Sequence, residues 1–380
     1  MTVEASAWKI SLSDIDLGPE EEAAVVDVLR SRWLTSGPRI AEFETRFAEH
    51  VGAKHAVALG NCTQALHLAL LAVGVGPGDE VIVPSLTFVA TVNAVLYCGG
   101  TPVFADIEGP ESLLLDSEDV KRKIGPKTRA IVPMHYGGYA CDMDRFGALC
   151  SEHGARLVDD AAHAPGSSYR GRPVGSLAEA SCFSFFGNKN LVTGEGGMVT
   201  TGSAEVAEFV KRQRSHGMTA SSYDKQRGHA FSYDVVTPGY NYRLTEMQAA
   251  LGIVQLSKLD RNNAKRRSLV ALYRERLAGV RGLTVPFSGR DAESSCHVFV
   301  VVLPEGSDRT QVQGALKAQG IQTSIHYQPV HRFTRFRDEF SASVPRLDAV
   351  ADRLLTLPLH PRMTAEDVAF VATALSETLA

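Results

Sequence analysis

Positive charge is not in excess in this chain of 380 residues, which carries 39 lysines and arginines against 43 aspartates and glutamates, for a formal net charge of −4. Proteins that bind DNA or RNA usually have a basic surface, so nucleic acid is not expected as a partner. No uninterrupted apolar run reaches membrane-spanning length, and Met1 to Lys9 lack the basic and apolar regions of a secretory signal. We therefore expect a cytoplasmic protein without a membrane partner.

Paired cysteines are also missing. The cysteines are scattered, with no CxxC pair and no dense framework of the kind found in small secreted domains, so we expect most of them to be reduced and buried. His326 and His331 have no clear third ligand, and a metal site is therefore not expected. The six cysteines are Cys62, Cys98, Cys141, Cys150, Cys182 and Cys296.

Short apolar runs alternate with helical patterns over the first two-thirds of the chain. Pro19, followed by three glutamates, is typical of a helix start, and Phe43, Phe47 and Val51 have the spacing of a helix that ends at Gly52. This alternation predicts an α/β layer with a largely parallel sheet. The candidate strands are His55–Leu59, Glu80–Val83, Pro102–Asp106, Ala130–Met134, Arg156–Asp159 and Ser181–Phe186.

A long charged helical pattern from about Thr245 to Leu277 ends this alternation. The shorter segments after it, and a terminal helix from Thr364, indicate a second and smaller α+β domain. We place the large α/β domain at residues 1–257 and the small domain at residues 258–380. The shorter segments are Cys296–Leu303, Gln311–Gln319 and Ile321–His326.

The segment Gly60–Thr63 joins the strand that ends at Leu59 to the helical run Gln64–Val73. The first N–H groups of such a helix are free and its dipole is positive there, so this turn is a candidate phosphate cradle. An ordinary capped turn has the same pattern, and both interpretations stay open. The glycines of Gly74–Gly78 precede a strand, whereas a dinucleotide-binding fingerprint joins a strand to a helix, so we interpret them as a turn.

Asp159 and Asp160 stand at the end of an apolar strand, where open parallel sheets bind their ligands. Neighbouring strand residues face opposite ways, so only one of the two carboxylates can point into a site. We predict that it is Asp160. A helix N-cap is the alternative role for this acid.

Lys189 follows the apolar and aromatic run Ser181–Phe186 and precedes the turn Gly194–Gly197. A partly desolvated lysine has a lowered pKa and can attack a carbonyl group, so Lys189 is predicted to form a Schiff base. An exposed or snorkelling lysine is the alternative. The segment Pro238–Arg243 sets polar and aromatic residues directly ahead of a helix, and an ordinary loop would explain it as well.

Together these segments resemble the DegT/DnrJ/EryC1/StrS family of sugar aminotransferases, which are fold-type I enzymes that use pyridoxal 5'-phosphate (PLP). The resemblance covers nearly the whole chain, and it implies a large domain with a mostly parallel central sheet and a smaller C-terminal α+β domain. Cys62 is a departure, because the family usually has glycine there. The matching blocks are Trp33–Pro38, Asn61–His67, Pro84–Thr91, Asp160–Ala164, Gly187–Lys189, Gly194–Gly197, Gly239–Arg243 and Leu357–His360.

The resemblance also implies residue roles. Lys189 would hold the cofactor and move a proton, and Asp160 would pair with the pyridine nitrogen. His163 would lie beside the phenolic oxygen, and Phe88 would stack on the ring. The phosphate would be held by the Cys62 backbone, Thr63, Ser184 and Asn241, the asparagine coming from the other subunit of a homodimer. Substrate contacts are predicted for His135, Arg243, His326 and Tyr327.

The implied reaction moves nitrogen from an amino acid, expected to be glutamate, to a nucleotide-linked keto-sugar for amino-sugar or antibiotic biosynthesis. Members that act at C-3 tend to have proline-glycine-lysine at the Schiff base and serine after the asparagine. Here Asn188 precedes the lysine and Tyr242 follows Asn241, as in C-4 members. We therefore predict a 4-keto-6-deoxyhexose or a ketopentose as the acceptor.

Four other functions have to be compared with this one. A C-3 aminotransferase and a PLP-binding regulatory protein without turnover both stay open, because a sequence shows a site and not a rate. The related sugar dehydratases carry histidine where this chain has Lys189, which argues against them. A nicotinamide dehydrogenase would need a glycine fingerprint that is missing here.

Overall fold

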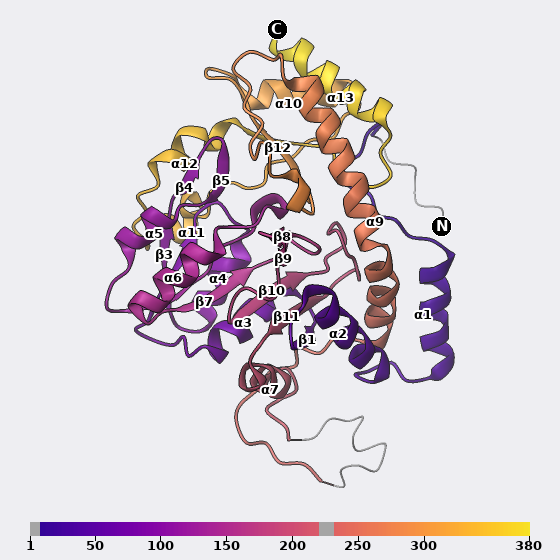
Figure 1. Ribbon diagram of the computed structural model, residues 1–380, viewed down its shortest axis with the longest axis vertical. Helices are drawn as coiled ribbons and strands as arrows, with labels where there is room; N and C mark the ends of the chain where they lie inside the picture. Colours follow the sequence, from indigo (N-terminus) through magenta and orange to yellow (C-terminus); the bar gives the residue numbers. More distant parts are fainter. Residues whose placement is uncertain (1–7, 220–231) are drawn as a thin grey trace.

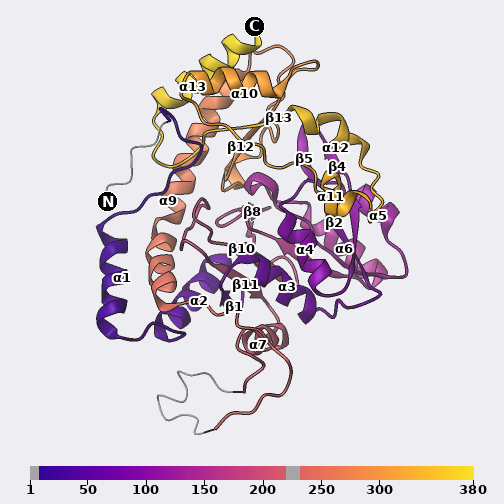
Figure 2. The same cartoon turned by 180° about the vertical axis from the view of Figure 1, so that it is seen from behind.

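The computed structural model describes residues 8–219 and 232–380. Views from opposite sides show a central sheet with helices packed around it and a smaller unit that contains the C-terminus (Figures 1 and 2). The long helix α9 (Glu246–Leu277) runs from the side of the sheet layer to this smaller unit. Among the described residues, no helix is both long and apolar enough to cross a membrane.

The central sheet has seven strands in the order β1-β11-β10-β7-β6-β2-β3. Six of them run in one direction, and β11 is antiparallel to both of its neighbours. The carboxyl ends of the six parallel strands therefore meet at one edge of the sheet. The strands are β1 (His55–Leu59), β2 (Glu80–Pro84), β3 (Thr101–Ala105), β6 (Thr128–Ile131), β7 (Arg156–Asp160), β10 (Ala180–Ser184) and β11 (Gly197–Thr201).

Both faces of the sheet are covered, which is why its strands are continuous apolar runs in the sequence. In β1, Ala56 and Ala58 face one core while Val57 and Leu59 face the other. One face packs against α2 (Pro38–Val51), α5 (Ser117–Lys123) and α6 (Met143–His153). The other face packs against α3 (Cys62–Ala72), α4 (Val89–Tyr97) and α7 (Ala204–Gln213).

The predicted strands and the largely parallel sheet are confirmed, with shifts of a few residues at the strand ends. The candidate strand Ala130–Met134 stops at Ile131, and Met134 forms only an isolated bridge to Asp160. Strand β11 was not predicted, because the glycines before Met198 suggested only a turn. Helix α1 (Pro19–Ser31) begins at the predicted proline, and α2 ends at Gly52, which has a φ of +66°.

The smaller unit is built on the second half of α9, a two-stranded sheet and two helices, with a core of its own that also includes Ile10. The predicted boundary after residue 257 falls inside α9, so one continuous helix belongs to both units. The elements of the C-terminal part are β12 (Phe299–Val302), α10 (Arg309–Ala318), α11 (Thr334–Arg337), α12 (Pro345–Val350), β13 (Leu354–Leu357) and α13 (Ala365–Leu379).

The chain does not stay in the smaller unit after α10. Val330 and Phe336 pack into the core of the large unit beside α3 and α4, and Leu347 packs into its other core. The C-terminal third therefore closes over the edge of the large unit. Two small hairpins complete the fold, β4 (Ile107–Gly109) with β5 (Ser112–Leu115) and β8 (Ser168–Tyr169) with β9 (Arg172–Pro173).

Gly197, the first residue of β11, lies against the start of α3. A Cβ atom at this position would be 2.4 Å from the carbonyl carbon of Asn61 and 2.7 Å from the backbone nitrogen of Cys62. These are backbone atoms at the junction of β1 and α3, so they cannot move aside as a flexible side chain would. Only glycine allows β11 to pair with β1 this close to the helix.

We expect Gly197→Ala to lower the free energy of unfolding by about 1–3 kcal/mol, the usual cost of overpacking. Denaturant-induced unfolding would measure it. Gly202→Ala is the matched control, because a Cβ there would have no atom within 4 Å. Equal stabilities of the two variants would contradict the expectation.

Candidate active site

A cavity of about 460 Å³ lies at the carboxyl edge of the sheet. Residues that follow β1, β2, β6 and β10 line it, together with the last residue of β7. It brings together nine of the predicted site residues. They are Cys62, Thr63, Phe88, Asp160, His163, Ser184, Lys189, His326 and Tyr327.

One wall of the cavity is the N-terminus of α3. Asn61 caps this helix: its side chain accepts a hydrogen bond from the Gln64 N–H (3.0 Å), and its carbonyl accepts one from the Ala65 N–H (3.2 Å). The N–H groups of Cys62 and Thr63 remain without a partner among the described residues. With the helix dipole and the Ser184 hydroxyl nearby, they form a binding site for an anion.

The thiol of Cys62 does not interfere with anion binding at these N–H groups. It is directed toward the carbonyl oxygen of Cys182 at 3.5 Å, and the residue is only 8% exposed. Burial and the nearby carboxylate of Asp160 raise the pKa of the thiol well above its usual range. The departure from glycine thus leaves the backbone N–H in place and adds a neutral side chain to the apolar layer behind it.

Asp160 lines the cavity, as predicted, and Asp159 faces the opposite way. One oxygen of Asp160 accepts from the Thr91 hydroxyl (2.7 Å) and the other from the Ala162 N–H (3.1 Å). Burial raises the pKa of Asp160, while both hydrogen bonds favour its charged form. A cation placed beside it in the cavity would favour the carboxylate further.

Lys189 is half-buried and lines the same cavity. Burial lowers the pKa of its amine to about 8, although Asp160 acts in the opposite direction. The loop is held through the next residue, Asn190, whose amide donates to Asn263 of α9 (2.8 Å) and to the carbonyl of Ser295 (2.7 Å). The loop that carries the nucleophilic amine is therefore held in place by the buried hydrogen bonds of Asn190.

His163 has a defined tautomer. The Gly137 N–H donates to its Nδ1 (3.2 Å), so the ring proton is on Nε2, which lies 2.7 Å from the Tyr327 hydroxyl. Burial and the charge of Lys189 lower the pKa of His163 well below its ordinary value, so the ring is neutral. Phe88 is 53% exposed, and its ring lies 5.8 Å from that of Tyr327.

Three predicted residues do not line this cavity. His135 is fully buried: its Nδ1 accepts from the Cys141 N–H (3.0 Å), and its Nε2 lies 3.5 Å from Asp159. A ring without exposed surface has nothing to offer a substrate, which corrects the prediction of a substrate contact. Arg243 is half-buried and Asn241 is exposed, both outside the lining of their own chain's cavity.

Sequence reasoning missed Thr91, Asn188 and Glu195. The hydroxyl of Thr91 in α4 donates to Asp160, and it also lies 2.7 Å from the hydroxyl of Thr87, four residues earlier. Asn188 and Glu195 line the cavity on either side of the lysine loop. The spacing of the two threonines could have indicated a shared polar site, but nothing in the sequence directs the other two inward.

Comparisons with known proteins agree with this geometry. The model of the DegT/DnrJ/EryC1/StrS aminotransferase family matches residues 16–376. The spore coat polysaccharide biosynthesis protein SpsC of Bacillus subtilis is 40% identical over 95% of both chains. PseC of Helicobacter pylori, an aminotransferase of pseudoaminic acid biosynthesis, is 31% identical with a TM-score of 0.91, over 97% of this chain and 99% of the other. DesI, solved in the presence of its TDP-sugar product, is 32% identical with a TM-score of 0.87, over 97% and 92%.

Aminotransferases of this family use PLP, and the cavity fits that cofactor. The free N–H groups of α3 suit its phosphate, and the buried carboxylate of Asp160 suits a protonated pyridine nitrogen. The amine of Lys189 would suit its aldehyde, and the aromatic face of Phe88 would suit its ring.

The pKa of Lys189 sets a pH dependence for cofactor loading. Only the unprotonated amine attacks an aldehyde, and with a pKa of about 8 its fraction rises as pH increases through that value. We expect the rate constant for PLP incorporation into the cofactor-free protein to rise between about pH 7 and pH 9 and then level off. Stopped-flow absorbance would follow it, with Lys189→Ala as the blank. A midpoint near the ordinary lysine value, about 10.4, would argue against desolvation at this site.

Proposed function

The chain belongs to the DegT/DnrJ/EryC1/StrS family of PLP-dependent sugar aminotransferases, and from this premise we propose that it transfers an amino group from glutamate to C-4 of a nucleotide-linked keto-sugar. The acceptor is a 4-keto-6-deoxyhexose or a ketopentose. The sugar carbon exchanges its carbonyl oxygen for the amino group and a hydrogen, while the α-carbon of glutamate exchanges its amino group and hydrogen for a carbonyl oxygen.

The observation that carries the proposal is the amine of Lys189 in one cavity with the carboxylate of Asp160 and the anion site of α3. Bound PLP supplies an electron sink for the carbon that loses its proton. Lys189 accepts that proton and returns it, a role that suits an amine with a pKa of about 8. Asp160 keeps the ring nitrogen protonated. His163 is neutral, so it can donate a hydrogen bond from Nε2 without adding a charge to the site.

The choice of C-4 rests on two residues. Asn188, which precedes the lysine, lines the cavity and contributes a neutral polar wall. Tyr242 stacks on Tyr240 with ring centroids 4.8 Å apart, and its hydroxyl lies 3.3 Å from His67. Within its own chain, Tyr242 stands beside Asn241 at the surface, so it would act on the sugar that is bound in the active site of the partner subunit.

A homodimer with shared active sites is part of the proposal. Asn241 is exposed, and so are Tyr97, Phe186 and Phe88, large aromatic side chains that a monomer gains nothing by exposing. Phe186 and Phe88 also line the cavity. A partner that covers this surface would close the cavity and bring its own Asn241 toward the phosphate.

The direct test is spectroscopic. The cofactor-loaded protein should be yellow, lose its colour with glutamate, and regain it with a nucleotide-linked 4-keto-sugar. Lys189→Ala should fold and retain some cofactor through the remaining contacts, yet show no turnover and no covalent fixation by borohydride. A normal rate in this variant would refute the assignment of Lys189.

Matched 3-keto and 4-keto acceptors separate the two regiochemical alternatives. We expect the new amine at C-4, located by NMR of the product. Preferred amination of the 3-keto acceptor would overturn the choice of C-4 alone, and no amination of any keto-sugar would favour a regulatory protein.

Complementation tests the shared site. Neither Lys189→Ala nor Asn241→Ala chains alone should be fully active, but a mixed dimer keeps one intact site if the asparagine acts across the interface. After random exchange we expect about a quarter of wild-type activity, because half of the dimers are mixed and one of their two sites is intact. Activity no higher than that of the separate variants, with exchange verified by mass spectrometry, would place Asn241 elsewhere.

A further inference from the structure

The segment 133–137, which follows β6, holds two residues of the cofactor cavity through its backbone. The Asp160 N–H donates to the carbonyl at the start of this segment (2.9 Å), and the carbonyl of Asp160 accepts from the His135 N–H (3.1 Å). Two residues further on, the Gly137 N–H donates to Nδ1 of His163 (3.2 Å). The positions of Asp160 and His163 therefore depend on the conformation of one short segment.

The side chain of His135 anchors this segment on the side away from the cavity. Its ring has no exposed surface and is not part of the cavity lining. Nδ1 accepts from the Cys141 N–H (3.0 Å), which leaves Nε2 to donate toward an oxygen of Asp159 that lies 3.5 Å away. The Ser181 hydroxyl of β10 donates to the same oxygen (2.9 Å). His135 and Asp159 thus connect the segment to β7 and β10.

Asp159 depends on these contacts because it has few others. The residue has no exposed surface, and its second oxygen, Oδ1, has no hydrogen-bond partner among the residues that the structure describes. A buried carboxylate that loses a partner is costly, so the end of β7 would move to reach water if the ring of His135 were removed. Because Asp159 and Asp160 are consecutive residues of one strand, the same movement would turn the Asp160 carboxylate.

On the cavity side, only two hydrogen bonds hold the Asp160 carboxylate. They come from the Thr91 hydroxyl (2.7 Å) and the Ala162 N–H (3.1 Å). Burial raises the pKa of Asp160, whereas these two bonds, Lys189 in the cavity and His135 behind the strand all act to lower it. The direction of the carboxylate therefore depends both on its own bonds and on the backbone that His135 and its partner hold.

We propose that His135 is a positioning residue, which acts through Asp159 and the segment 133–137 to keep the Asp160 carboxylate directed at the ring nitrogen of the bound cofactor. This role rests on the proposed function, in which Asp160 pairs with that nitrogen. His135 itself contacts neither cofactor nor substrate. Its effect should therefore appear in the protonation of the ring nitrogen before any amino acid or sugar is added.

The test is nitrogen-15 NMR of the protein loaded with PLP that is labelled at the pyridine nitrogen, recorded as a function of pH. His135→Phe, which keeps a ring without nitrogen, should weaken the affinity of the pyridine nitrogen for its proton by about 3- to 10-fold. His135→Gln, whose amide can still donate to Asp159, should recover most of that affinity. Ser181→Ala, which removes the other bond to Asp159, should weaken it in the same direction but by less.

Tyr273→Phe is the matched control. Tyr273 is as fully buried as His135, and the change also removes one buried hydrogen bond, to the Pro358 carbonyl (2.9 Å), but in the core of the smaller unit. It should lower stability without changing the titration of the pyridine nitrogen. An equal change in Tyr273→Phe would overturn the proposal, and so would an unchanged titration in His135→Phe and Ser181→Ala. If His135→Phe does not fold, the result for Ser181→Ala decides.

Asp160→Asn separates this proposal from the proposed function. A weaker proton affinity in Asp160→Asn, without any change in His135→Phe and Ser181→Ala, would overturn the role of His135 alone. No change in Asp160→Asn would remove Asp160 from the ring nitrogen, and the role of His135 with it. Neither result depends on which sugar is aminated, because no acceptor is present.

Discussion

The common direction of six strands is the constraint on which the rest of this structure depends. Their carboxyl ends meet at one edge, so the anion site after β1, Phe88 after β2, Asp160 of β7 and Lys189 after β10 come together although they are far apart in sequence. The reversed strand β11 fits into this arrangement only because Gly197 has no side chain to displace the start of α3.

Desolvation shifts the pKa values of these residues. Burial lowers the pKa of Lys189 toward neutrality, keeps His163 neutral and raises the pKa of Asp160. Burying polar groups is costly unless hydrogen bonds compensate, and here they do: Asp160 accepts from Thr91 and Ala162, and His163 is bonded at both ring nitrogens. The reactive amine of Lys189 has no hydrogen-bond partner among the residues that the structure describes, which suits a group that must form a bond.

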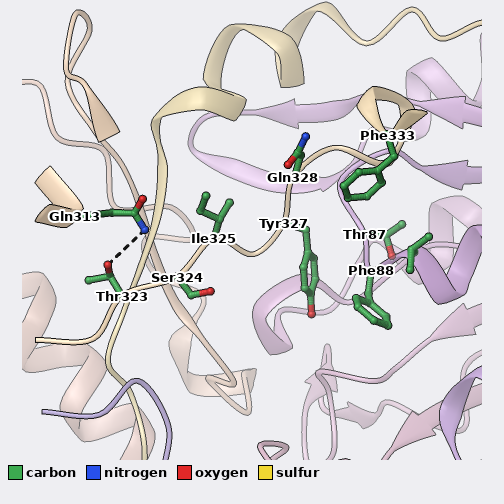
Figure 3. Close-up of a pocket in the computed structure, with 10 residues that line it drawn as sticks. Thr87, Phe88, Gln313, Thr323, Ser324, Ile325, Tyr327, Gln328 and Phe333 are labelled. Atoms are coloured by element: carbon green, nitrogen blue, oxygen red, sulfur yellow. Dashed lines mark hydrogen bonds between the residues drawn. The ribbon is translucent and has the colours of Figure 1, made fainter. Parts of the chain in front are cut away.

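Both units contribute residues to the site. Asn190 ties the lysine loop to α9 and to Ser295. His326 and Tyr327, from the C-terminal part, line the same cavity as Lys189. A second cavity, lined among others by Thr87, Gln313 and Phe333, has walls from both units (Figure 3). Helix α9 connects the units without a break. Any movement of the smaller unit would therefore change the surroundings of Lys189 and of this second cavity together.

The sequence by itself determined most local elements, namely six of the seven strands of the central sheet and the extent of α9, because each depends on a periodicity of two or 3.6 residues. The same periodicity showed that only one of Asp159 and Asp160 could face the site, but it did not show which one. The resemblance added residue roles that no periodicity contains. Only the tertiary structure decided that His135 lies behind the site and that Gln313 and Phe88 line one cavity. These depend on contacts between residues distant in the chain, and side-chain patterns carry no record of such distances.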